Sequence, residues 1–150
     1  MTAEATSLAL GLMKHLFLAM AMMTAQPSQG AVIDLDRFAY GQQANELMLR
    51  QRREIGDLSS VVRPIDVLFY GTELNIKQVA AELFSRGWRI NSVNASEEGK
   101  WSLSAERDQA VDADAIRDLT IVALEMEKSW GVEFDGWGAV IVTGTEVPAP

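Results

Sequence analysis

The residues best suited to chemistry are two carboxylates near the end of the chain, Glu133 and Asp135. They are two positions apart, so an extended segment would place both side chains on one side of the chain. Paired carboxylates can perform general acid–base catalysis. The sequence gives them no nucleophile, no glycine-rich phosphate loop and no set of metal ligands, so a catalytic centre is not expected here.

The composition narrows the function classes further. The 150 residues include no Cys and one His, which excludes disulfides, thiolate zinc sites, iron–sulfur clusters and multi-histidine sites. The formal net charge is −8, from 13 Lys and Arg against 21 Asp and Glu. This argues against a protein whose main task is to bind the phosphate backbone of nucleic acids. We therefore expect a binding or regulatory domain with no cofactor, no small-molecule substrate and no direct nucleic-acid binding.

Acidic residues gather in the second half of the chain. Between residues 106 and 135 they face only Arg107, Arg117 and Lys128; the set is Glu106, Asp108, Asp112, Asp114, Asp118, Glu125, Glu127, Glu133 and Asp135. Such a face would steer a basic, arginine-rich protein toward the domain. A solvated helix face that keeps the protein soluble would give the same pattern. Both interpretations stay open.

A tryptophan between two glycines also suggests binding. Trp137, flanked by Gly136 and Gly138, could be an exposed aromatic anchor for a protein partner. Alternatively the glycines supply positive φ angles, Trp137 covers the core and Asp135 caps a turn. The candidate partner-binding residues are therefore Glu133, Asp135, Gly136, Trp137, Gly138, Asp112, Asp114 and Asp118.

Three arginines form a small basic patch at the end of the first expected helix: Arg50, Arg52 and Arg53. The patch could contact a phosphate or an acidic partner. Cations suit the C-terminal end of a helix, so a solvated helix end is the favoured interpretation.

Periodicity and turn signals predict the elements that would position these residues. In chain order we expect a helix over 42–55, a strand over 65–70, a helix capped by Thr72 or Asn75 and ended by Gly87, a strand over 88–93, a strand over 101–106, a helix capped by Asp112 or Asp114 and ended by Gly131, and a strand over 139–142. A turn-rich segment is expected over 133–138. This order predicts an α+β fold of the ferredoxin-like (βαββαβ) kind: an antiparallel sheet with helices on one face, preceded by an N-terminal helix.

The first 30 residues form a segment of their own. Residues 8–25 are apolar apart from Lys14 and His15. They fit a signal peptide cleaved near residue 31, a membrane anchor, or a helix packed on the domain. The protein would be exported in the first case and cytoplasmic otherwise. The expected division is an apolar leader and a domain, residues 1–30 and 31–150.

Two stretches carry a family resemblance. One joins Ile-Gly-Asp-Leu at 55–58 to Arg-Pro-Ile-Asp-Val-Leu-Phe-Tyr at 63–70, and the other is Gly-Val-Glu-Phe-Asp-Gly-Trp-Gly at 131–138. In the types and spacing of their amino acids, residues 46–142 resemble the RraB-type family, regulators of ribonuclease E activity with a ferredoxin-like fold. The resemblance implies a non-enzymatic protein that inhibits ribonuclease E by binding its non-catalytic region. An exported chain would never meet that enzyme, and its partner would be an unknown periplasmic protein.

Overall fold

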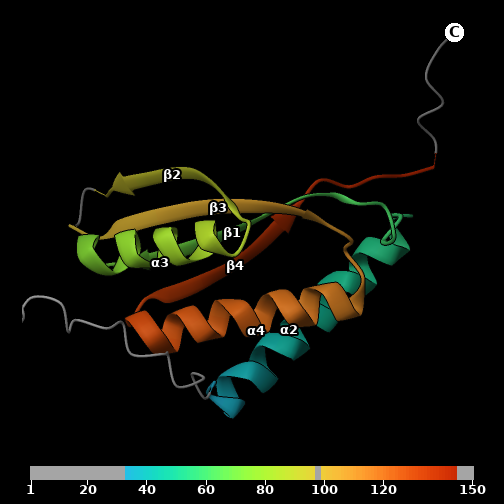
Figure 1. Cartoon of the computed structure of the whole chain (residues 1–150). Helices are drawn as coiled ribbons and strands as arrows, with labels where there is room; N and C mark the ends of the chain where they lie inside the picture. Colours follow the sequence, from blue (N-terminus) through green and yellow to red (C-terminus); the bar gives the residue numbers. More distant parts are fainter. Residues whose placement is uncertain (1–32, 97–98, 145–150) are drawn as a thin grey trace, which may run out of the picture. The chain divides into compact units, whose positions relative to one another are not determined.

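The computed structural model describes residues 33–96 and 99–144. In chain order these residues form α2 (Leu35–Glu54), β1 (Arg63–Gly71), α3 (Glu73–Ser85), β2 (Arg89–Ala95), β3 (Trp101–Gln109), α4 (Ala113–Trp130) and β4 (Glu133–Ala139) (Figure 1). The strands form one antiparallel sheet in the order β2-β3-β1-β4. The α+β fold with a leading helix, expected from the sequence, is confirmed.

The core lies between the sheet and the two helices α3 and α4. Alternation along β1 turns Ile65, Val67 and Phe69 toward these helices, and all three are buried. The facing positions recur at helical spacing, which gives each helix one apolar stripe; they are Ile76, Val79 and Leu83 on α3, and Ile116, Leu119, Ala123 and Met126 on α4. Helix α2 packs beside α4 (Figure 1).

Each described helix begins at a side-chain cap. Asp34 accepts a hydrogen bond from the Arg37 amide at 2.9 Å, so α2 starts seven residues earlier than the sequence analysis predicted. Thr72 caps α3 and Asp112 caps α4, which selects one residue from each pair of candidates. Capping oxygens of this kind satisfy amides that the first turn leaves unpaired.

The segment expected to be turn-rich is a strand. Residues 133–138 belong to β4, and of the last strand, expected over 139–142, only Ala139 belongs to it. The register with β1 shifts between Leu68 and Phe69, so that Asp135 has no partner on β1. Gly136, with φ +132°, follows it. An aspartate followed by a glycine is common both in turns and in β-bulges. This explains why a turn was predicted where the strand has a bulge.

The interpretations of the leader concern residues 1–30, which lie outside the described residues. Within the described ranges, no helix is both long enough and apolar enough to cross a membrane.

Candidate functional site

The candidate residues of the sequence analysis lie on two elements, β4 and the beginning of α4. Asp112, Asp114 and Asp118 belong to its beginning, and the other five lie on β4, which follows its last turn. Asp112 caps α4, and Asp114 and Asp118 pair with Arg117. The structure therefore does not bring all the candidates into one site.

Among the β4 candidates, two carboxylates face solvent and one glycine lies close to a neighbouring strand. Glu133 and Asp135 are exposed and Phe134 between them is buried, as alternation along an extended segment predicts. Gly138 lies opposite Asp66, where a Cβ atom would come within 3.0 Å of the Asp66 Oδ1 atom. In the described part of the chain, no cluster of three or more His, Asp or Glu side chains could hold a metal ion.

A groove of about 300 Å³ lies between α2, α4 and β4, and we call it the α2–β4 groove. Three of the candidates line it: Asp135, Gly136 and Trp137. Its other apolar walls are Tyr40 and Met48 on α2, Leu124 on α4 and Phe134 on β4. It is the place where the structure gathers candidate binding residues with aromatic and apolar side chains.

A chain of hydrogen bonds fixes the floor of the α2–β4 groove. The Trp137 indole Nε1–H donates to Asn45 Oδ1 at 2.9 Å, and Asn45 Nδ2–H donates to Thr120 Oγ1 at 2.9 Å. The Thr120 hydroxyl in turn donates to the Ile116 carbonyl oxygen at 2.8 Å. The Arg52 guanidinium lies 5.9 Å from the centre of the Trp137 ring. Trp137 is thus half-buried and held by α2, and its contact with a partner stays a prediction.

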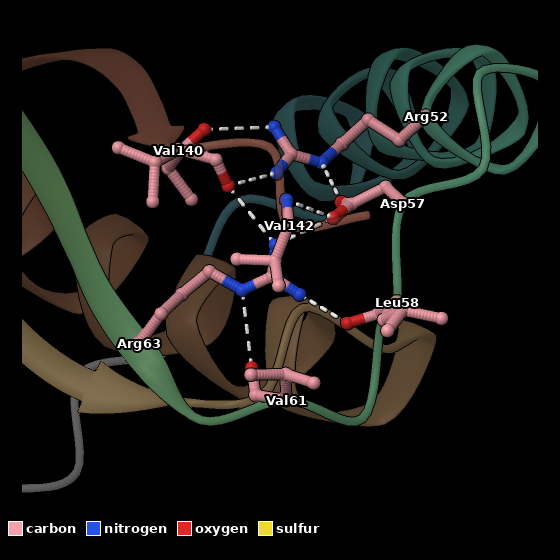
Figure 2. Close-up of polar contacts among 8 residues, drawn as sticks. Arg52, Asp57, Leu58, Val61, Arg63, Val140 and Val142 are labelled. Carbon is pink, nitrogen blue, oxygen red and sulfur yellow. Dashed lines mark hydrogen bonds and ion pairs between the residues drawn. The ribbon is translucent and has the colours of Figure 1, made fainter. Parts of the chain in front are cut away.

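The sequence analysis missed a buried ionic network at the C-terminal end of α2. The Asp57 carboxylate accepts hydrogen bonds from Arg52 Nε at 2.7 Å, Arg63 Nη1 at 2.5 Å and the Val142 amide at 2.9 Å (Figure 2). The prediction that Arg52 is solvated is wrong, because its side chain is only 10% exposed. Asp57 is 1% exposed and Arg63 is 3% exposed. We call these three residues the Asp57 network.

The Asp57 network also ties three separate segments together through backbone carbonyls. Arg63 donates to Leu58, Val61 and Val140, and Arg52 donates to Ala139 and Val140 (Figure 2). Charge-assisted bonds of this kind satisfy most of the donors that burial takes from water. The end of α2, the loop before β1 and the chain after β4 are therefore fixed to one another.

The network keeps Asp57 ionised. Burial alone would raise the pKa of the carboxyl group. The hydrogen bonds from Arg63, the Val142 amide and Arg52 outweigh it and lower the pKa of Asp57 from 3.8 to about 2. Asp57 and Arg63 belong to the first stretch of the family resemblance, so that stretch has a structural role here.

Most of the acidic residues that seemed unopposed in sequence have arginine partners in space. Arg89 pairs with Glu106 and Asp108, Arg86 with Glu125, Arg37 with Glu127, and Arg117 with Asp114 and Asp118. Several of these arginines come from elements distant in sequence, so no local pattern indicates the pairs. Asp112, Glu133 and Asp135 form no ion pair with any described residue. Asp112 caps α4 and accepts a hydrogen bond from the Ala115 amide, at the end of the helix where negative charge is favoured. The uncompensated negative charge of this set therefore lies at β4.

Comparison with known proteins gives one family. The family model described as "Regulator of ribonuclease activity B" matches residues 42–139, from within α2 to the end of β4. A search of curated proteins finds no match.

Proposed function

Since the chain belongs to the family of regulators of ribonuclease activity B, we propose that it inhibits a ribonuclease E-type enzyme by binding to that enzyme's non-catalytic region. The family is regulatory and non-catalytic, which supports a role exercised through protein binding. The identity of the enzyme and the region that is bound go beyond the family match and belong to the proposal.

The observation that carries the proposal is the extent of the family match. It runs through almost all of the described fold and includes the Asp57 network as well as the β4 residues Asp135, Gly136 and Trp137. The exposed carboxylates on β4 add support, because a basic protein segment would meet uncompensated negative charge there.

The test uses the full chain and two forms of purified ribonuclease E, the complete enzyme and its catalytic part alone. We expect the chain to bind the complete enzyme and slow its cleavage of RNA, and to leave the catalytic part unaffected. Equal inhibition of both forms would contradict binding through the non-catalytic region. Absence of binding to the complete enzyme would overturn the proposed function.

The apolar run over residues 8–25 favours a second candidate, an exported domain of the same family with an unknown periplasmic partner. Expression in a bacterial host, followed by separation of periplasm from cytoplasm and measurement of intact mass and N-terminal sequence, tests it. A periplasmic chain that starts near residue 31 would establish export and remove ribonuclease E as partner. A cytoplasmic chain that retains residue 1 or 2 would remove this candidate.

A further inference from the structure

We propose that the α2–β4 groove receives an apolar or aromatic side chain of the ribonuclease-type partner, and that a neighbouring arginine or lysine of the same partner segment pairs with Asp135. This inference rests on the proposed function and names the surface and the chemistry by which binding would occur.

The size and lining of the groove suit one large side chain. Its volume of about 300 Å³ is at the lower end of the range for small-molecule pockets, roughly 300–1,000 Å³. Leu124 and Phe134 are buried in its walls, whereas Tyr40 and Met48 are 68% and 40% exposed beside it. Tyrosine and methionine are enriched at protein interfaces, where each offers a large contact area.

The floor of the groove is already ordered. The bonds that join Trp137, Asn45 and Thr120 satisfy the polar atoms there, so an apolar side chain can enter without breaking them. A surface that is fixed before binding loses less conformational entropy when the partner arrives.

The charge beside the groove determines which residue accompanies the apolar side chain. Arg37 also lines the groove, but its guanidinium already donates to the Phe134 carbonyl oxygen at 3.0 Å and lies 3.3 Å from Glu127. Asp135 is exposed and has no ion pair among the described residues.

Lys100 borders the adjoining hollow together with Asp135 and Glu133, and it forms an ion pair with neither. The charge left without a partner at this end of the groove is therefore negative. It is complementary to a basic residue.

The first test fills the groove. Ala44 lies in its lining on α2, and Ala44→Trp would occupy the space that the partner side chain needs. Gln43 is exposed on the same helix and outside the lining, so Gln43→Trp is the matched control. With purified complete ribonuclease E as probe, we expect Ala44→Trp to raise Kd at least tenfold and Gln43→Trp to leave it within about twofold.

The second test reverses charge. Asp135→Lys and Glu54→Lys change the net charge of the chain equally, and Glu54 is exposed at the end of α2, outside the groove. We expect Asp135→Lys to raise Kd about tenfold, with a smaller difference at high salt, and Glu54→Lys to change it much less. Thermal melting of all four variants confirms that each is folded.

The outcomes distinguish a failure of the groove inference from a failure of the proposed function. If the unmodified chain binds ribonuclease E and Ala44→Trp binds equally well, the groove inference is overturned and the proposed function stands. If Asp135→Lys and Glu54→Lys weaken binding equally, the pairing with Asp135 is overturned, because only overall charge would then matter. If the unmodified chain does not bind, both the proposed function and the inference fail.

Discussion

Asp57 and Arg63 form an ion pair of 2.5 Å, between Oδ1 and Nη1, in which neither side chain is more than 3% exposed. Arg52 completes the pair from the other side, at 2.7 Å from Oδ2. One carboxylate thus compensates two buried guanidinium groups that come from different elements. The stability of this end of the domain depends on that single negative charge.

Replacement of Asp57 by Asn should destabilise the domain by roughly 3–5 kcal/mol, because it leaves two buried arginines without a counter-charge. Urea denaturation followed by tryptophan fluorescence measures the loss. The matched control is Asp114→Asn, which removes an exposed pair with Arg117 and should cost less than about 1 kcal/mol. Equal losses in the two variants would contradict the importance of the Asp57 network.

The stability of the domain should fall in acid because of the same carboxyl group. The pKa of Asp57 is about 2 in the folded chain and ordinarily 3.8, so the folded state favours the ionised form. This contribution, about 2 kcal/mol, is complete above a pH of about 4 and is lost as the pH falls to about 2. Urea denaturation at a series of pH values measures it, and the Asp57→Asn variant should lack this part of the pH dependence.

Three other carboxyl groups also make stability depend on pH, and they do so equally in the unmodified chain and in the Asp57→Asn variant. Hydrogen bonds from Arg89 lower the pKa of Glu106 and of Asp108, which acts in the same direction as Asp57. Burial raises the pKa of Glu127, which favours its protonated form in the folded chain and therefore acts in the opposite direction. A pH dependence that is identical in the two chains would contradict the lowered pKa of Asp57.

Replacement of Trp137 by Phe should separate hydrogen bonding from packing in the groove floor. Phe keeps an aromatic ring against α2 but leaves Asn45 Oδ1 without the indole donor, so we expect a loss of about 1–3 kcal/mol. Trp101→Phe is the control: Trp101 is also partly buried against the core with a cation, Lys77, over its ring, but its indole forms no hydrogen bond with any described residue. It should therefore lose less stability than Trp137→Phe. A Trp137→Phe variant as stable as the unmodified chain would show that the bond to Asn45 contributes nothing.

The two glycines beside Trp137 should respond differently to alanine. Gly136 has φ +132°, which L residues rarely adopt, so Gly136→Ala should cost about 1–3 kcal/mol. At Gly138 the nearest atoms to an added Cβ belong to the carboxylate of Asp66, an exposed side chain that can move, so the loss should be smaller. Chemical denaturation of both variants measures the difference, and a larger loss at Gly138 would contradict the bulge at Gly136.

Local patterns in the sequence predicted most of the fold. The alternation around Leu103 and the apolar stripe from Ile116 to Trp130 lie within single elements, and each element formed where its pattern indicated. The prediction failed at β4, because Asp135 and Gly136 form a bulge from residues that also favour a turn.

The candidate site was less accessible to sequence reasoning, because its contacts join distant residues. Asp57 and the Val142 amide are 85 positions apart, and Trp137 and Asn45 are 92 apart. Nothing near Arg52 in the sequence indicates that it turns inward to Asp57 and the end of β4, whereas Arg50 and Arg53 beside it remain exposed as predicted.

Helix α2 also covers one edge of the sheet. β4 is an outer strand of the sheet, and an outer strand normally offers free backbone groups to any passing chain. Here Arg37 and Arg52 on α2 donate to the carbonyl oxygens of Phe134 and Ala139, and Asn45 binds Trp137 between them. Those carbonyls are not available to a foreign strand while α2 is in place. A chain shortened past α2 would expose this edge, and it should self-associate even though every strand of the sheet remains.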